Sequence, residues 1–245
     1  MINHRQATAQ EIAFSGLNHR VYLPEEVQYP RGAVVLVHGR AGNDRVMWPF
    51  SRAFREHKLI AVSPEAFCDD PVGGKSWWLV EEWKGDEAWD EGPRKPTRPE
   101  QLNLALDKLE FFISSLPDLY PIDPERVFAF GFSQGAAMVS TLSLRKPSMF
   151  KGVALLAGFI PRVVFDQREV FVSADIRSGQ TSLPKYFMAS GTQDATIPIV
   201  KAQRGRDGLR SLGAEVTYCT EDVGHKVGAS CMRGLKDWFD KCCEE

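Results

Sequence analysis

Long hydrophobic runs are missing from this chain of 245 residues. A membrane-spanning helix needs about 18 consecutive apolar residues, and no such stretch occurs. Residues 1–14 include His4, Arg5 and Glu11 and lack the apolar core of a signal peptide. We therefore expect no integral membrane segment and a cytoplasmic location.

An excess of one charge is also missing. The chain has 30 Lys+Arg residues against 32 Asp+Glu residues, which gives a formal net charge of −2. A general nucleic-acid-binding protein usually carries a basic field, so we expect no nucleic-acid partner. The apolar fraction of 43% and the charged fraction of 25% are ordinary for a globular protein. They exclude a disordered, collagen-like or coiled-coil chain.

Cysteine is scarce, and its spacing fits no metal site. The cysteines are odd in number and scattered, and no H-E-x-x-H or comparable ligand cluster occurs. We therefore expect no metal, and we expect the cysteines to be reduced thiols in a cytoplasm. The five cysteines are Cys68, Cys219, Cys231, Cys242 and Cys243.

The sequence does contain an alternation of short β-branched runs and longer helical periods. Several short runs are unbroken apolar stretches, typical of strands buried on both faces of a parallel sheet. The alternation predicts an α/β fold with a mainly parallel central sheet and helices on both faces. The predicted strands span residues 19–23, 33–37, 59–62, 127–130, 153–156, 186–189 and 215–219. The predicted helices span residues 102–116, ending at Pro117, a segment that opens just after Ser133, about 200–212, and about 227–242.

Two stretches interrupt the alternation. Residues 69–99 hold four of the six tryptophans without any periodicity, and residues 161–184 are also irregular. Long structureless segments in compact domains are usually functional or disordered, and tryptophan argues against disorder. We predict a single domain over residues 1–245, with about 1–16 as an N-terminal extension and 69–99 as a Trp-rich active-site loop. The four tryptophans are Trp77, Trp78, Trp83 and Trp89.

The G-x-S-x-G pattern of a nucleophile elbow occurs as Gly-Phe-Ser-Gln-Gly at residues 131–135. A predicted strand precedes it and a predicted helix follows, which is the setting that the elbow requires. The sharp turn needs nearly bare neighbours two residues to either side of the serine, and both positions are glycine. This makes Ser133 the candidate nucleophile. The alternative is a glycine-lined packing turn with an incidental serine.

A serine hydroxyl needs a base that is held by a third group. In this fold the partners follow in the order Ser, then Asp or Glu, then His, and His225 is the one histidine beyond Ser133. Asp194 follows the predicted strand 186–189 directly, where an orienting carboxylate is expected. Asp222 is the alternative acid, although it lies only three residues before the base; Asp175 lies in an irregular stretch.

An oxyanion needs two backbone N–H donors. One is expected from the residue after the nucleophile, Gln134, and the other from the loop after an early strand, at Arg40. Gly39 lets that loop turn so that the Arg40 N–H faces the site. His38, directly before it, could be mistaken for the base, but we expect it to hold the loop by hydrogen bonding.

Six short segments then occur in a fixed order: HGR at 38–40, GFSQG at 131–135, AGFIP at 157–161, GTQD at 191–194 with IP at 197–198, LGAEV at 212–216, and GH at 224–225. In this the chain resembles the phospholipase/carboxylesterase family of α/β-hydrolases, the group that includes acyl-protein thioesterases and small bacterial carboxylesterases. The resemblance covers about residues 17–241. It implies a compact α/β-hydrolase with no large cap domain, no cofactor, and a triad of Ser133, Asp194 and His225.

We expect a serine hydrolase that cleaves carboxylic esters of small to medium acyl chains, with a small-molecule ester as its partner. An acyl-protein thioesterase or lysophospholipase, acting on a lipidated protein or a lysophospholipid, is the alternative of the same chemistry. A non-catalytic binding module on a hydrolase scaffold is the third. Trp77, Trp78 and Phe159 are the candidate lining of an acyl pocket. The tryptophans could equally pack the long loop onto the sheet.

Overall fold

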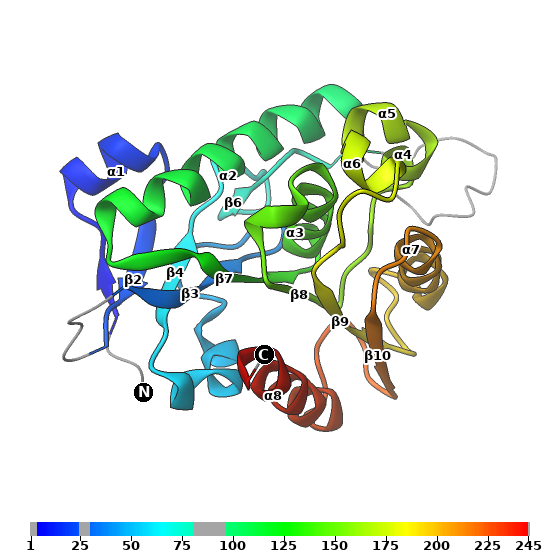
Figure 1. The fold of residues 1–245 in the computed structure, drawn as a ribbon. Helices are drawn as coiled ribbons and strands as arrows, with labels where there is room; N and C mark the ends of the chain where they lie inside the picture. Colours follow the sequence, from blue (N-terminus) through cyan, green and yellow to red (C-terminus); the bar gives the residue numbers. More distant parts are fainter. Residues whose placement is uncertain (1–3, 25–29, 81–96, 245) are drawn as a thin grey trace.

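The computed structural model describes residues 4–24, 30–80 and 97–244. Within them the chain forms an eight-stranded sheet in the order β1-β2-β4-β3-β7-β8-β9-β10 (Figure 1). From β4 to β10 in this order, neighbouring strands are parallel, whereas β2 at one edge is antiparallel to both β1 and β4. The sheet strands are β1 Arg5–Gln6, β2 His19–Tyr22, β3 Arg31–Val37, β4 Ile60–Pro64, β7 Ile122–Phe132, β8 Gly152–Leu156, β9 Lys185–Gly191 and β10 Val216–Glu221.

The prediction of an α/β fold with a mainly parallel sheet is confirmed, and each of the seven predicted strands is present. The structure adds strand β1 and a small hairpin, β5 Cys68–Asp69 with β6 Lys75–Ser76. Strands of two residues show no alternation of apolar and polar side chains, so the sequence pattern could not reveal them.

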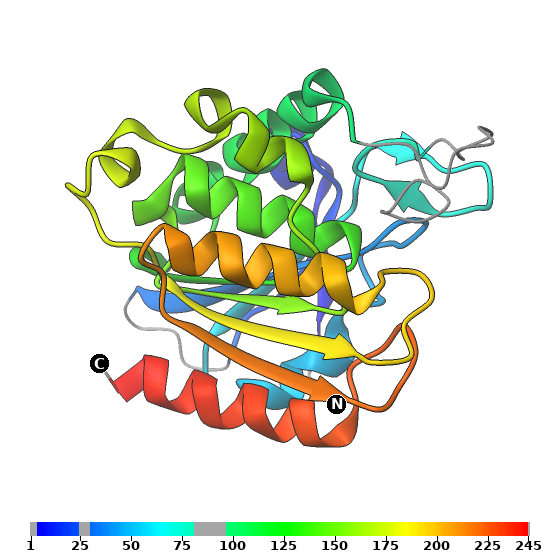
Figure 2. The ribbon, with the colours of Figure 1, turned by 90° about the vertical axis from the view of Figure 1, so that its right-hand side faces the viewer.

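Helices cover both faces of the sheet (Figures 1 and 2). Along β3, Val35 and Val37 belong to the core under the helices of one face, whereas Val34 and Leu36 belong to the core under α8 on the other. This alternation follows from the two-residue period of a strand. The helices are α1 Ala9–Ser15, α2 Pro99–Leu119, α3 Gln134–Arg145, α4 Arg162–Asp166, α5 Arg168–Phe171, α6 Ala174–Arg177, α7 Ile199–Ser211 and α8 Ala229–Glu244, with 3-10 turns at Trp48–Ala53, Arg55–His57 and Pro147–Met149.

Helix α2 does not end at Pro117, as predicted, but continues to Leu119 with the proline inside it. A proline removes one N–H donor and usually kinks or ends a helix, but only two more helical residues follow Pro117 here. Here the Tyr120 N–H donates to the Leu116 carbonyl at 2.9 Å, which closes the last turn.

The two irregular stretches differ in structure. Residues 161–184 contain the three short helices α4–α6, which lie near α3 in Figure 1. The Trp-rich stretch contributes the β5–β6 hairpin, and its remaining part, residues 81–96 with Trp83 and Trp89, lies outside the described residues. At the N-terminus, β1 pairs with β2 and α1 packs on α2.

The prediction that all cysteines are reduced thiols is wrong. Cys219 on β10 and Cys231 on α8 form a disulfide, with their Cα atoms 5.7 Å apart. The prediction relied on compartment and on scattered spacing, but the packing of the last helix beside the edge strand brings these two side chains together. Cys68 and Cys243 are free thiols.

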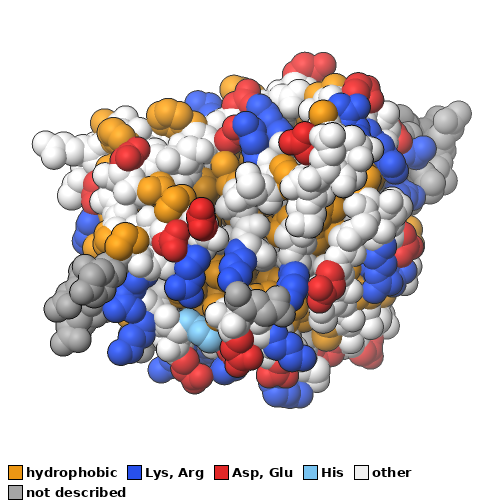
Figure 3. Space-filling view, viewed as in Figure 1, with side chains coloured by type: hydrophobic (Ala, Val, Ile, Leu, Met, Phe, Trp, Pro, Cys, Tyr) orange, Lys and Arg blue, Asp and Glu red, His pale blue; other side chains and the backbone are white. Residues whose placement is uncertain are grey.

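Basic and acidic side chains are intermixed over the face shown in Figure 3, and neither sign dominates it. Within the described residues, no helix combines the length and the apolar character needed to cross a membrane.

Candidate active site

Ser133 lies in a sharp turn between the central strand β7 and helix α3. Its backbone angles are φ 53° and ψ −114°, in a region that side-chain-bearing residues rarely adopt. The turn is crowded: a Cβ atom at Gly131 would overlap the carbonyl of Gly135, and one at Gly135 would overlap the carbonyl of Val37. Glycine at both positions is therefore a steric requirement of this turn, and strand–turn–helix geometry lifts the serine to the carboxyl edge of the sheet.

His225 and Asp194 continue from Ser133 in a hydrogen-bonded row. The Nε2 atom of His225 lies 3.0 Å from Ser133 Oγ, and its Nδ1 atom lies 2.8 Å from Asp194 Oδ2. Because a carboxylate only accepts, Nδ1 carries the proton and Nε2 is left free to accept from the serine hydroxyl. Figure 2 shows the loops after β9 and β10, which carry these two residues, at the same edge of the sheet.

The Asp194 carboxylate is fixed by its own loop. Its Oδ1 atom accepts the backbone N–H groups of Thr196 at 2.8 Å and Ile197 at 2.9 Å, and its side chain is 2% exposed. Asp222, the alternative acid, is exposed and accepts from the Thr192 hydroxyl at 3.0 Å. The structure therefore brings Asp194, and not Asp222, to the histidine. Asp175 lies on the short helix α6.

The two predicted oxyanion donors lie next to the serine. Gln134 is the first residue of α3, and the Arg40 loop passes so close that a Cβ at Gly39 would lie 3.1 Å from Ser133 Cβ. Among the described residues, the backbone N–H groups of Arg40 and Gln134 find no acceptor. An N–H group without an acceptor beside a nucleophile is available to a developing oxyanion.

A buried carboxylate holds the Arg40 loop from behind. Asp70, on the turn of the β5–β6 hairpin, accepts from Arg40 Nε at 2.9 Å and from Ser76 Oγ at 2.8 Å. The same Ser76 oxygen accepts the Ala41 N–H at 2.9 Å. Hydrogen bonds from Arg40 lower the pKa of the Asp70 carboxyl to about 2, and those from Ser76 and the Val72 N–H add to the effect. The carboxylate is thus ionised at neutral pH.

The prediction that His38 holds this loop is confirmed. Its Nδ1–H donates to the Gly39 carbonyl at 2.6 Å, and its Nε2 accepts the Ala66 N–H at 3.0 Å. Burial lowers the pKa of His38. Both ring nitrogens are occupied, so the ring has no position from which to act on Ser133.

The tryptophans Trp77 and Trp78 are buried next to His38 and Gln134. Trp77 is fully buried, and its indole N–H donates to the His38 carbonyl at 2.9 Å. The Gln134 side chain accepts the Trp77 N–H at 2.9 Å and donates to the Trp78 carbonyl at 2.8 Å. This arrangement matches the alternative in which the tryptophans pack the loop onto the sheet. Phe159 is half-buried, with Lys201 Nζ 5.6 Å from its ring centre.

Asp70 and Ser76 were missed by the sequence analysis. They lie in a stretch without periodicity, and no motif pairs an aspartate with a serine six residues later. Identifying them from the sequence would have required knowing that the hairpin packs against the Arg40 loop.

The comparison with protein families is decisive. Residues 22–243 match the family model described as Phospholipase/Carboxylesterase. The chain belongs to the phospholipase/carboxylesterase family. The predicted resemblance is confirmed.

A curated protein is similar to this chain in sequence, and several solved structures are similar to it in fold. A protein of Nocardia uniformis subsp. tsuyamanensis, named as an esterase (NocK), is 35% identical over 77 residues, which are 31% of this chain and 22% of NocK. The chain thus matches about a fifth of that curated relative's length. The structure of esterase PE8 has a TM-score of 0.75 at 20% identity, over 90% of this chain and 96% of PE8. The structure of the Bacillus cereus carboxylesterase has a TM-score of 0.73 at 20% identity, over 96% of this chain and 100% of the carboxylesterase. These two likenesses show a shared fold.

Proposed function

We propose that the protein is a serine hydrolase that cleaves carboxylic esters of small to medium acyl chains through Ser133, His225 and Asp194. The observation that carries the proposal is the continuous hydrogen-bonded row from Ser133 Oγ through the imidazole to Asp194. Membership of the phospholipase/carboxylesterase family supports the same reaction class. The substrate is a small-molecule ester.

The first step forms an acyl-enzyme. His225 Nε2 takes the proton of Ser133 while Oγ attacks the ester carbonyl. The Nδ1–H group stays with Asp194, whose buried carboxylate orients the ring and stabilises the imidazolium. His225 then gives its proton to the leaving alcohol as the carbon–oxygen bond breaks.

The second step returns the enzyme to its starting state. Water loses a proton to His225 and attacks the acyl carbonyl, and the imidazolium then protonates Ser133 as it leaves. In both steps the Arg40 and Gln134 N–H groups stabilise the oxyanion. Such backbone donors need no reorganisation during the reaction, and losing one typically costs about 10²–10³ in turnover.

The test is hydrolysis of p-nitrophenyl esters from acetyl to palmitoyl, with wild type beside Ser133→Ala. We expect turnover that peaks at short to medium chains and that Ser133→Ala reduces by about 10⁴–10⁶. Ser178→Ala, which removes an exposed hydroxyl at the end of α6, is the matched control and should match wild type.

The outcomes separate the alternatives. A peak at long chains would favour a thioesterase or lysophospholipase that acts on lipidated protein or lysophospholipid. Full activity in Ser133→Ala would contradict the assignment of the nucleophile. No turnover and no labelling by a fluorophosphonate would favour a binding module.

A further inference from the structure

The segment that carries His225 connects the edge strand β10 to helix α8. Strand β10 ends at Glu221 and α8 begins at Ala229, so residues 222–228 have no regular structure of their own. Strand β10 pairs with β9 on one side and forms the edge of the sheet. The position of the imidazole therefore depends on how the two ends of this segment are attached.

One side of the segment is attached to the loop that carries Asp194. The Thr192 N–H donates to the Glu221 carbonyl at 2.9 Å, and the Gln193 N–H donates to the Val223 carbonyl at 3.1 Å. The two loops are in close contact, since a Cβ atom at Gly191 would overlap the Val223 carbonyl. These bonds set the segment's distance from Asp194. They do not fix the other end of the segment, which leads into α8.

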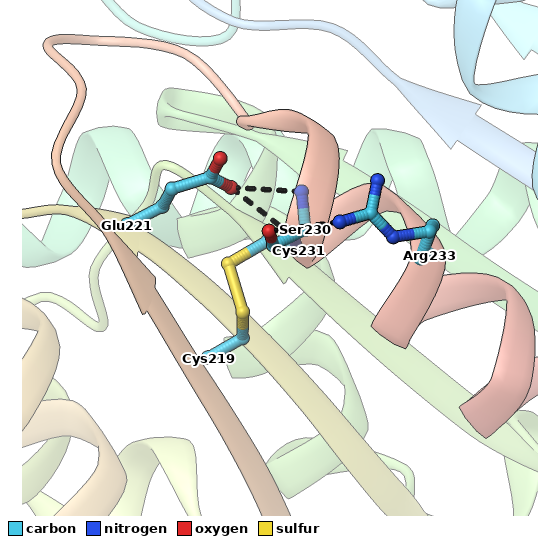
Figure 4. Close-up of a disulfide and its surroundings, with 5 residues drawn as sticks. All are labelled: Cys219, Glu221, Ser230, Cys231 and Arg233. Atoms are coloured by element: carbon cyan, nitrogen blue, oxygen red, sulfur yellow. Dashed lines mark hydrogen bonds between the residues drawn. A yellow bond between two sulfur atoms is a disulfide. The ribbon is translucent and has the colours of Figure 1, made fainter.

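The far end is attached to the first turn of α8 by the Glu221 side chain. Its Oε2 atom accepts the N–H groups of Ser230 at 3.1 Å and Cys231 at 3.2 Å (Figure 4). A carboxylate at this position both satisfies two unpaired donors and interacts favourably with the helix dipole. Gly228 leaves room for it, because a Cβ atom there would overlap the Glu221 carboxyl group.

The disulfide joins the same two elements at the same place. Cys219 precedes Glu221 by two residues on β10, and Cys231 is the residue whose N–H binds the Glu221 carboxylate. Figure 4 shows the disulfide and the carboxylate side by side between the strand and the helix. Together they close residues 219–231 into a ring that contains His225.

We propose that the Cys219–Cys231 disulfide and the Glu221 carboxylate form a clamp that positions His225, and that opening the disulfide lowers turnover. The inference rests on the proposed function. Cys219, Cys231 and Glu221 are positioning residues, because they act on the reaction through His225. In a cytoplasm, where thiol pools keep most cysteines reduced, the clamp would make activity depend on redox state.

A dithiol opens the clamp by thiol–disulfide exchange. Cys231 is buried and Cys219 half-buried, so the attacking thiolate reaches the Cys219 sulfur, forms a mixed disulfide and releases Cys231 as a thiolate near the α8 N-terminus. The second thiol of the dithiol then displaces Cys219. In sum, the protein disulfide gains two electrons and two protons and becomes two thiols, while the dithiol becomes a cyclic disulfide.

The test compares the oxidised enzyme with the enzyme treated with dithiothreitol, using p-nitrophenyl butyrate and a fluorophosphonate label. Alkylation and mass spectrometry report the state of both cysteines, and circular dichroism reports the fold. We expect kcat to fall about 10–10²-fold on reduction, because small misplacements of a catalytic group have effects of this size. KM should change little, labelling of Ser133 should slow in parallel with kcat, and reoxidation should restore both.

Variants identify the responsible sulfur atoms and the carboxylate. The double variant Cys219→Ser/Cys231→Ser should have the low kcat of the reduced enzyme and no response to dithiothreitol. Cys243→Ser removes a free thiol elsewhere on α8 and should behave as wild type. Glu221→Ala should lower kcat with the disulfide intact, whereas Glu221→Gln, which keeps an acceptor oxygen, should recover most of it.

A reduced enzyme that remains folded and keeps its full kcat would overturn the clamp. If the reduced enzyme unfolds at the assay temperature, the oxidised Glu221→Ala variant decides, and an unchanged kcat there overturns the clamp as well. Failure of the proposed function looks different, because turnover would then be absent in both redox states or would survive Ser133→Ala. If turnover is absent but Ser133 is labelled, the labelling rate alone decides the clamp. If neither turnover nor labelling occurs, the clamp is overturned together with the proposed function.

Discussion

Ser133 and His225 are one hydrogen bond apart, yet the chain holds them in place by different means. Ser133 lies between a central strand and α3, in a turn whose shape is set by backbone crowding at two glycines. His225 lies on a segment at the edge of the sheet, held on one side by two backbone hydrogen bonds and next to α8 by the Glu221 side chain and a disulfide. The comparison indicates that Ser133, the proposed nucleophile, is positioned by packing of the main chain. The proposed base, His225, depends in addition on side-chain links that can be replaced one at a time.

The largest loss of kcat should come from changing Asp194, which binds His225. Asp194→Asn should lower kcat about 10³–10⁴-fold, because the amide favours the wrong imidazole tautomer while keeping the shape. Asp222→Asn, on the same loop as His225 but bonded to Thr192, is the matched control and should cost less than about threefold. Steady-state kinetics on a short-chain ester would measure both. The reverse result would mean that Asp222 orients the base.

Glycines test the contrast directly. Gly135→Ala should lower the free energy of unfolding by about 3 kcal/mol, because its Cβ would overlap the Val37 carbonyl and the backbone must shift. Gly224→Ala in the His225 segment is the matched control, since its Cβ would meet only the Gln193 carbonyl at 3.9 Å. Urea unfolding of both variants would show the difference. Equal losses would mean that the two regions are packed alike.

A smaller effect is expected where side chains support the serine region. Asp70→Asn should lower kcat about tenfold by loosening the Arg40 loop, with little change in KM. The lowered pKa of Asp70 means that its ionised form stabilises the fold above about pH 4, and that this contribution is lost as the pH falls toward 2. Between about pH 4 and pH 2, the free energy of unfolding should fall less steeply with pH in Asp70→Asn than in wild type. An unchanged slope would show that Asp70 adds nothing to acid stability.

The sequence predicted the parts of this molecule that carry periodic or motif signals. The seven strands follow from apolar runs, and the turn at Ser133 from two glycines flanking a serine between a strand and a helix. Asp194 and His225 followed from chain order, although their contact with Ser133 needed the structure.

Supports formed by tertiary contact could not be predicted. Asp70 lies in a hairpin without periodicity and binds the Arg40 side chain. Glu221 binds the first turn of a helix that begins eight residues later. The disulfide was missed because the spacing of Cys219 and Cys231 carries no information on how α8 packs against β10. Local patterns specify elements, whereas contacts between distant loops depend on the assembled fold.

The most direct test of Ser133 as the nucleophile is to locate a covalent label by mass spectrometry. The enzyme would be treated with a fluorophosphonate, digested, and sequenced across residues 127–145. We predict a single modified residue, Ser133, with labelling abolished in Ser133→Ala and slowed at least about 10²-fold in His225→Ala. A label on another serine, or labelling of Ser133 at the same rate without His225, would contradict the claim that this row forms the active site.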